Sequence, residues 1–233
     1  MNKGRGPRYY GDGMARTVLI TDGDTALGGE LVRLLCTPEC RVVTSVPAES
    51  PGKDYPSIPK SAVLVPWNRR SSASARNLVV SALNSCGRID DAIVLDVPRA
   101  SPLPVQDLPA SEIERAFDLG LKPALFLVRE LLSYFLQEKR GVLALASFST
   151  RPQESFTPAL ERSVREAFKA FAVSTIAGAA ESGICANAYQ SYGATPEEFA
   201  LFIDRTLQEK GRKLSGKWFT CQPRSGIFVG RRV

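Results

Sequence analysis

A strand, a polar turn and a helix follow one another in residues 17–35, TVLITDGDTALGGELVRLL, and this unit most limits what the chain can fold into. Val18-Leu19-Ile20 is a short apolar run typical of a buried strand, and four leucines after the turn recur at helical spacing. The turn itself, residues 21–25, is polar. A helix that begins directly after such a turn points free N–H groups and a positive dipole end at it, which suits a phosphate. The unit therefore predicts the opening βα pair of a nucleotide-binding α/β sheet.

The rest of the chain continues this alternation. Besides the first strand we expect strands over 41–46, 61–66, 92–95, 141–149, 183–188 and 218–221, and helices over 71–86, 121–136, 164–180 and 199–209. Alternating strands and helices predict a Rossmann-type, doubly wound parallel sheet in a single domain. A chain of 233 residues can bury the core of one such domain. We expect it to cover residues 16–233, after a disordered basic, glycine-rich tail at 1–15, and to end in a basic tail at 226–233.

Three local patterns predict where helices begin. Asp24 or Thr25 is placed to cap the helix of the first unit. Ser111 with Glu114 has the spacing of a capping box, and Thr195-Pro196-Glu197-Glu198 predicts another helix start.

Composition excludes several kinds of chemistry. The chain has no histidine, which rules out Ser-His-Asp and Cys-His catalysis and histidine metal sites. Its five cysteines form no C-x-x-C pair, so no metal site is expected, and an odd number without a signal peptide indicates reduced thiols in the cytoplasm. No apolar run is long enough to span a bilayer. The net charge of +6 is dispersed, so we do not expect a nucleic-acid partner, although the charge permits one.

Three segments in order carry a resemblance to a known family. They are GRID at 87–90 before a strand, GICANA at 183–188 and LSGKW at 214–218. With this order and spacing, the chain from Thr17 onward resembles the short-chain dehydrogenase/reductase family over nearly its whole length. The resemblance implies a Rossmann-type fold, a nicotinamide dinucleotide and oxidoreductase chemistry.

The family's phosphate-binding turn, TGxxxGxG, falls on residues 21–28, TDGDTALG. Asp22 and Ala26 stand where the family has glycines. The resemblance implies that the cofactor contacts would come from Thr21, Gly23, Asp24, Thr25, Leu27 and Gly28, and from Asn68 at the family's adenine-binding aspartate.

The second strand ends Thr44-Ser45-Val46, with neither the acid that binds the ribose of NAD nor an arginine for NADP. We therefore expect no cofactor, or weak binding of NADP.

The family's catalytic residues are also changed. The catalytic serine falls near Phe148, between Ser147 and Ser149, and the catalytic asparagine near Gly120. The Tyr-x-x-x-Lys pair falls on Glu161 and Arg165. None of the tyrosines at 9, 10, 55, 134, 189 and 192 has a lysine four residues later.

This loss matters because tyrosine, with a pKa normally near 10 that the lysine lowers, protonates the alkoxide formed by hydride transfer. Glu161 is ordinarily an anion at pH 7 and would repel that oxyanion. We expect Glu161 and Arg165 to form an i, i+4 ion pair worth about 0.3–0.5 kcal/mol, and no catalytic residue at these positions. Residues 189–195 also leave almost no room for the family's substrate lid.

These losses favour a homologue of the family without oxidoreductase activity, acting through protein association. The helices over 121–136 and 164–180 carry more apolar residues than one core stripe needs, and the family pairs through them. We expect a homodimer or homotetramer, or pairing with an active relative, through a face with Phe168, Phe171 and Ala167, Ala170, Ala172, Ala177, Ala179 and Ala180. One alternative is an atypical NADP-dependent reductase that uses Ser149, Glu161 and Arg165 differently. Another is a nucleotide- or RNA-binding regulator.

Overall fold

The computed structural model describes residues 15–50, 53–97, 100–152, 156–211 and 213–222. The expected tail at 226–233 and, except for residue 15, the one at 1–15 lie outside the described residues. Within these ranges, seven parallel strands form one sheet in the order β3-β2-β1-β4-β5-β6-β7. The strands are β1 (Arg16–Ile20), β2 (Cys40–Pro47), β3 (Val63–Trp67), β4 (Asp91–Asp96), β5 (Val142–Ser149), β6 (Cys185–Tyr192) and β7 (Lys217–Cys221). The predicted doubly wound parallel sheet is confirmed.

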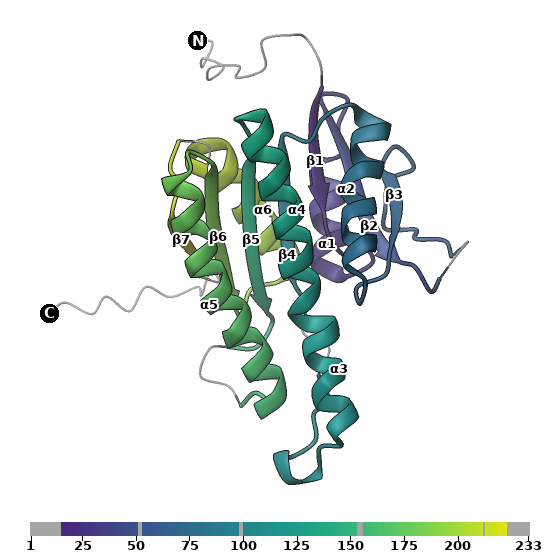
Figure 1. Cartoon of the computed structure of the whole chain (residues 1–233), viewed down its shortest axis with the longest axis vertical. Helices are drawn as coiled ribbons and strands as arrows, with labels where there is room; N and C mark the ends of the chain where they lie inside the picture. Colours follow the sequence, from purple (N-terminus) through teal and green to yellow (C-terminus); the bar gives the residue numbers. More distant parts are fainter. Residues whose placement is uncertain (1–14, 51–52, 98–99, 153–155, 212, 223–233) are drawn as a thin grey trace, which may run out of the picture.

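Helices cover both faces of this sheet (Figure 1). One layer consists of α2 (Ser72–Cys86), α4 (Lys122–Glu138) and α5 (Ala159–Glu181), and the other of α1 (Ala26–Leu35) and α6 (Pro196–Thr206). The helix α3 (Ala110–Gly120) precedes α4 and extends beyond the carboxyl ends of the central strands (Figure 1). The described residues also form a short 3-10 helix, η1 (Val105–Asp107), and a short π-helix, η2 (Leu207–Gly211).

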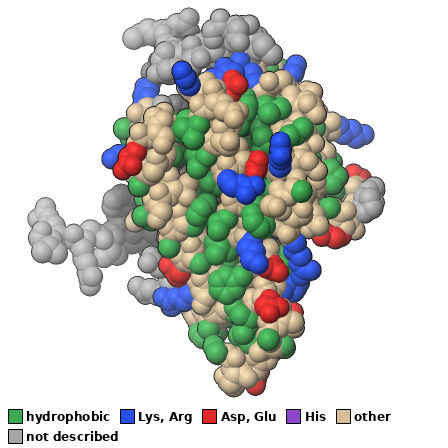
Figure 2. All heavy atoms as spheres, viewed as in Figure 1, with side chains coloured by type: hydrophobic (Ala, Val, Ile, Leu, Met, Phe, Trp, Pro, Cys, Tyr) green, Lys and Arg blue, Asp and Glu red, His purple; other side chains and the backbone are tan. Residues whose placement is uncertain are grey.

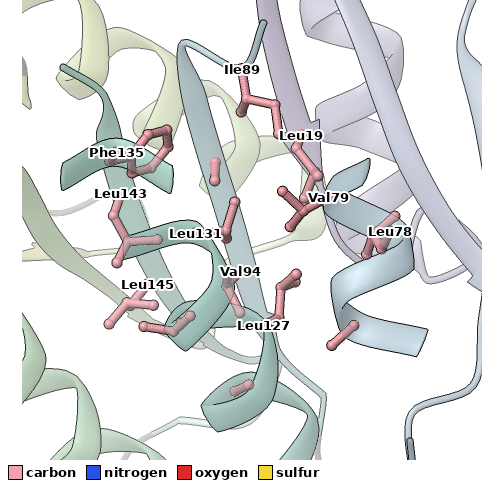
Figure 3. Close-up of a cluster of buried hydrophobic side chains, with 14 of the residues drawn as sticks. Leu19, Leu78, Val79, Ile89, Val94, Leu127, Leu131, Phe135, Leu143 and Leu145 are labelled. Atoms are coloured by element: carbon pink, nitrogen blue, oxygen red, sulfur yellow. The ribbon is translucent and has the colours of Figure 1, made fainter. Parts of the chain in front are cut away.

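The core lies in two layers because strands of a parallel sheet are buried on both faces. Strand residues alternate between the layers, so Leu143 and Leu145 of β5 face α4 while Ala144 and Ala146 face the α1 and α6 side. Figure 3 shows strand residues against α2 and α4, namely Leu19, Val94, Leu143 and Leu145 facing Leu78, Val79, Leu127, Leu131 and Phe135. The same alternation places Asp96, Ser147 and Tyr192, near the strand ends, on the α5 side.

Two of the three predicted helix starts are confirmed. Thr25 caps α1, accepting a hydrogen bond from the Gly28 N–H at 3.1 Å. Thr195 and Glu198 form a reciprocal capping box at α6. The capping box predicted at Ser111 is wrong, because α3 begins at Ala110 behind Pro109. Proline has a φ suited to the start of a helix, so the helix starts two residues earlier than the Ser111 pattern indicates.

Several boundaries differ from the sequence prediction. The helix α5 begins at Ala159 rather than near 164, directly after Pro158. The strand β6 continues to Tyr192, because its ladder with β5 runs on to the pair Ser149 and Tyr192. Three residues then join β6 to α6, so the described connection has no room for a lid. None of the helices in the described part of the chain is both long and apolar enough to span a bilayer.

Candidate functional site

The crevice at the carboxyl ends of β1, β2 and β3 is the first candidate site. The chain passes from β1 through α1 to β2 on one side, whereas β4 pairs with β1 on the other side. Open parallel sheets bind ligands where the strand order reverses in this way, outside the carboxyl ends. The turn after β1, residues 21–25, lies at this reversal.

Asp22 holds an unusual backbone conformation in the turn, with a positive φ of 55°. The N–H groups of the turn are largely used within the protein. The Asp22 N–H donates to Ser45 Oγ at 2.8 Å, the Gly23 N–H to the Ser45 carbonyl at 3.0 Å, and the Thr25 N–H to the Asp22 carbonyl at 2.9 Å. These donors are therefore not available to a phosphate.

The two glycines assigned to cofactor contacts, Gly23 and Gly28, of which only Gly28 matches a glycine of the family pattern, are explained by packing of the turn itself. A Cβ on Gly28 would lie 2.0 Å from the carbonyl oxygen of Asp22, and a Cβ on Gly23 would lie 2.4 Å from Thr44 Oγ1. Both positions need glycine whether or not a ligand binds. Their presence therefore carries no information about a cofactor.

A buried ion pair between Asp22 and Arg69 spans the crevice. The Arg69 guanidinium donates to Asp22 Oδ1, its Nε donates to the Leu119 carbonyl at 3.0 Å, and its carbon lies 5.0 Å from the centre of the Trp67 ring. Arg69 is 8% exposed and Asp22 3%. The pair ties the end of β1 to the residues after β3 and to the end of α3. Sequence reasoning missed Arg69, although its position directly after the third predicted strand was a visible signal.

A cavity of about 210 Å³ adjoins this pair. Its lining comes from the ends of β1, β2 and β3 and from α3, and consists of Asp22, Ser45, Val46, Pro47, Glu49, Trp67, Arg69 and Leu119. Asn68, the predicted adenine contact, is not part of this lining, and its side-chain oxygen accepts from the Arg70 N–H at 3.0 Å. Glu49, which sequence reasoning missed, puts a second carboxylate beside the crevice.

The other predicted cofactor residues serve the fold of the turn. Thr21 is buried, and its hydroxyl accepts from the Leu95 N–H at 2.9 Å. Leu27 is packed in the core, Thr25 caps α1, and Asp24 is half-buried. With Asp22 in place of a glycine and Arg69 bound across the crevice, these residues do not fit a dinucleotide pyrophosphate.

The second candidate site lies where β4, β5 and α5 meet. The Ser147 hydroxyl donates to Asp96 Oδ2 at 2.8 Å, and both residues are buried. Burial raises the pKa of Asp96 to about 6, while Arg165, the Ser147 hydrogen bond, Lys169 and Arg69 act in the opposite direction. Ser149 is half-buried, and its hydroxyl accepts from the Arg151 N–H at 3.1 Å.

Glu161 and Arg165, at the positions of the family's catalytic pair, bind each other. Arg165 donates from Nη2 to Glu161 Oε1 at 3.3 Å and from Nη1 to the Phe148 carbonyl at 2.5 Å. Glu161 also lies 3.5 Å from Arg151. The predicted i, i+4 ion pair is confirmed. Gly120 contributes no polar group here, since it packs so closely on Val164 of α5 that a Cβ would lie 2.5 Å from that side chain.

A tyrosine and a lysine do meet at this end of the sheet, from different elements. Lys169 of α5 donates to the Tyr192 hydroxyl of β6 and to Glu166 at 2.7 Å. Burial opposes charge on Lys169, but the hydrogen bonds to Glu166 and Tyr192 outweigh it and raise its pKa. Sequence reasoning missed this contact because it depends on how α5 packs on β6. Among the described residues, no three acidic or cysteine side chains are grouped as a metal site.

A shallow apolar groove lies on the outer face of α4 and α5. A cavity of about 280 Å³ there is lined by residues of both helices, Leu125, Val128, Arg129, Leu132, Leu136, Phe171, Ser174, Thr175, Gly178 and Ala179, and by Ser182 and Ile184 after α5. Figure 2, viewed onto these helices, shows hydrophobic side chains along this face. The assignment of Phe168 and Ala172 to the association face is wrong, because both are buried against the sheet.

No protein-family model matches the chain, and no curated protein matches it. Solved structures do. A 3-ketoacyl-(acyl-carrier-protein) reductase from Brucella melitensis complexed with NADH is 13% identical with a TM-score of 0.76, over 89% of this chain and 96% of that one. A short chain dehydrogenase from Mycobacterium smegmatis is 17% identical with a TM-score of 0.75, over 91% and 93%.

A short chain dehydrogenase from Leptospira borgpetersenii with bound NAD+ is 15% identical with a TM-score of 0.75, over 89% and 91%. Each similarity extends over nearly the whole of both chains, and at these identities it is a similarity of fold. The chain has the fold of the short-chain dehydrogenase/reductases.

Proposed function

We propose that this chain has lost the oxidoreductase activity associated with its fold and acts through protein association. The observation that carries the proposal is the buried ion pair between Asp22 and Arg69. It lies in the crevice at the carboxyl ends of β1, β2 and β3, where open parallel sheets bind dinucleotides.

The energetics of that pair oppose cofactor binding. A pyrophosphate that approached the turn would meet the Asp22 carboxylate or would have to draw Arg69 away from it. Removing one partner from a buried ion pair costs about 3–5 kcal/mol. Since about 1.4 kcal/mol is tenfold in affinity, this cost corresponds to a loss of more than a hundredfold.

The catalytic positions support the same conclusion. A carbonyl reduction needs a proton donor beside the forming alkoxide. Glu161 is held by Arg165 and Arg151, and a guanidinium does not give up its proton in proteins. The Ser147 hydroxyl is already directed to Asp96.

The face on α4 and α5 supports association. Leu125 and Leu136 are 37% and 48% exposed there, and Leu132 and Phe171 are half-buried beside them. Soluble monomers seldom leave a contiguous apolar patch of this kind uncovered. We propose that a second copy of the chain covers it by two-fold pairing, with a homotetramer or a pair with an active relative as other outcomes of the same measurement.

Two measurements test the proposal. Oxidation of NADPH or NADH with a panel of ketones, aldehydes and quinones should stay below about 1 turnover per second, the low end of ordinary enzyme rates. Light scattering of the purified chain should give a multiple of its 25.3 kDa mass. Ordinary turnover refutes the loss of activity, and a monomer that stays soluble refutes self-association.

Variants test the loss of cofactor binding and the association face separately. Asp22→Gly with Ala26→Gly restores the glycines of the turn and leaves Arg69 without its partner, so calorimetry should show stronger NADPH binding than for the parent. Asp118→Asn, which removes a carboxylate from the surface of α3, should leave binding unchanged.

Phe171→Glu should dissociate the assembly because it buries an unpaired charge, whereas Leu201→Glu on the other helix layer should not.

A second candidate function rests on the contact between Lys169 and Tyr192. A phenol beside an ammonium group is a suitable proton donor, so the contact favours an atypical reductase that uses a tyrosine from β6. Such an enzyme would lose its turnover in Tyr192→Phe. The non-catalytic protein would have no turnover to lose.

A further inference from the structure

We propose that a cavity beside α6 and the end of β7 binds a segment of this same chain, residues 223–233, as an intramolecular ligand. This inference goes beyond the proposed function, which concerns the crevice beside Asp22 and the face on α4 and α5. The segment lies outside the described residues. The lining and charge of the cavity, together with the sequence of the segment, support the proposal.

The cavity adjoins α6, which lies on the face of the sheet opposite α4 and α5 (Figure 1). Its volume is about 530 Å³, and its described lining consists of Glu198, Leu201, Phe202, Asp204, Arg205, Cys221 and Gln222. Positions 198, 201, 202 and 205 have helical spacing and so share one face of α6. Leu201 is 50% exposed there, and Phe202 is half-buried. Covering this apolar surface is favourable for any segment with apolar side chains of its own.

The charge of the lining favours a cationic occupant. Glu198 and Asp204 place two carboxylates in the lining, and neither forms an ion pair with another described residue. The one cation of the lining, Arg205, is already 3.6 Å from Glu209. An occupant that carries positive charge would therefore meet two carboxylates that have no cation beside them.

The sequence of the segment matches both features of the cavity. Residues 223–233 read PRSGIFVGRRV, with three arginines and no acid. Ile227-Phe228-Val229 is an apolar run that can cover Leu201 and Phe202. The arginines before and after this run can then approach the two carboxylates.

The segment also begins at the cavity. Gln222 belongs to the lining, and Ile227 follows it after five residues, which span up to about 17 Å. The helix α6 has 11 residues and is about 16 Å long, so the apolar run can reach any part of it. Pro223, Ser225 and Gly226 are residue types that turns favour.

Such a short tether makes even a weak contact sufficient. A segment attached at the edge of its own site has an effective concentration of about 1 mM. With a dissociation constant of about 0.1 mM, the bound form would exceed the free form about tenfold.

Trypsin cleavage after Arg224 measures whether the segment is bound. We expect the purified full chain to lose residues 225–233 about tenfold more slowly than a free synthetic peptide of residues 219–233, because only the unbound segment is cleaved. The intact mass of the protein during early digestion gives the rate. Equal rates for the chain and the peptide overturn the proposal.

Variants on both sides of the contact identify the cavity as the site. Leu201→Lys should raise the cleavage rate about tenfold, toward that of the free peptide, because it removes the apolar contact and adds a cation. Val80→Lys is the matched control, at a position of α2 that is 43% exposed, and should change nothing. Phe228→Ser should act like Leu201→Lys, and the double variant should show no further increase. Additive effects overturn the contact.

A charge exchange tests the ionic part independently. Asp204→Arg should raise the cleavage rate about 2–5-fold, the effect of an exposed charge, and Asp118→Arg on α3 should not. Adding Arg231→Glu and Arg232→Glu to Asp204→Arg should restore the slow cleavage, because opposite charges face each other again. Absence of this rescue overturns the proposal even if Leu201→Lys fails to fold.

Dilution distinguishes the chain's own segment from that of a second copy. Protection within one chain should persist from about 50 μM to about 0.5 μM protein, because the effective concentration depends only on the tether. Protection that disappears on dilution assigns the cavity to a second copy and overturns the proposal. The proposed function is tested separately, since Phe171→Glu should change the mass in light scattering and leave the cleavage rate unchanged. Failure of either proposal therefore leaves the other standing.

Discussion

Two aspartates end neighbouring strands at the same edge of the sheet, and their surroundings differ. Asp22, after β1, has a guanidinium in direct contact, from Arg69. Asp96, at the end of β4, has a hydroxyl in contact, from Ser147, while the cations of Arg165, Lys169 and Arg69 act on it from further away. Both are almost completely buried.

The difference shows how the contacts of a buried carboxylate compensate for its burial. An ion pair in contact compensates burial directly. A single hydroxyl compensates it only partly, and the pKa of Asp96 is accordingly raised to about 6. Asp22 is therefore held in a direct ionic contact with Arg69. Asp96, in contrast, changes its protonation state close to neutral pH. Four predictions test this comparison.

The largest effect on stability is expected at the ion pair between Asp22 and Arg69. Arg69→Met should lower the free energy of unfolding by about 3–5 kcal/mol, because it leaves the Asp22 carboxylate buried without its partner. Urea unfolding at pH 7 measures the change. Arg70→Met, at the exposed neighbouring position, is the matched control and should change stability by less than about 0.5 kcal/mol. Equal effects at both positions would show that the pair has no special role.

The second-largest effect on stability is expected at Asp96 and depends on pH. Its pKa is raised from 3.8 to about 6 in the folded state, so the folded protein binds the proton more tightly than the unfolded chain does. The contribution of Asp96 to the free energy of unfolding is fully present below about pH 4. It is lost as the pH rises through 6. Two pKa units correspond to about 3 kcal/mol.

Asp96→Asn should therefore be more stable than the parent at pH 7, by up to about 3 kcal/mol, and the difference should shrink to near zero by pH 4. Unfolding curves across pH 4–8 measure it, with Asp118→Asn on the surface of α3 as the control. A difference that is constant with pH contradicts the raised pKa.

A smaller effect is expected from Ser147→Ala. The serine hydroxyl favours the charged form of Asp96, so its loss should raise that pKa further. The variant should be destabilised by about 2 kcal/mol at pH 7, as expected for a hydrogen bond to a charged group, and by less at pH 4. Ser149, two residues further along β5, makes no hydrogen bond to Asp96 among the described residues. The control variant Ser149→Ala should therefore show no such pH dependence. The opposite trend with pH would show that Ser147 favours the neutral acid.

The smallest effect is expected from Glu161→Gln. Its pair with Arg165 is partly exposed on the glutamate side, 19%, so the change should cost about 0.5 kcal/mol or less. Salt should reduce that cost further, because exposed charges are screened. A loss of several kcal/mol, or an effect independent of salt, would place this pair with the buried pair of Asp22 and Arg69 instead.

Most of the fold could be predicted from local sequence patterns. Each predicted strand is present, with boundaries that shift by a few residues, because apolar runs between polar turns are buried wherever the sheet forms. The cap at Thr25 and the capping box at Thr195 could be predicted because both partners lie within one helical turn. The prediction at Ser111 failed because Pro109 offered a competing helix start nearby.

The candidate sites could be predicted only in part. The sequence placed Asp22 in the turn and Glu161 beside Arg165 on one helix, and the structure keeps both. Arg69, Glu49, Asp96 and the contact of Lys169 with Tyr192 were missed. Arg69 directly follows a predicted strand, but local rules do not indicate that Asp22 is its partner, and no residue type and spacing single out the others.

The sequence by itself determined the elements, their alternation and the loss of Tyr-x-x-x-Lys, because these depend on neighbours within a turn or a strand. Tertiary structure alone decided the partners of the buried charges. Asp22 and Arg69 are 47 residues apart, Asp96 and Ser147 are 51 apart, and Lys169 and Tyr192 are 23 apart. Such contacts form where parallel strands end at one edge of the sheet and a helix packs across them. Strand order and register, rather than distance along the chain, therefore decide which charges meet.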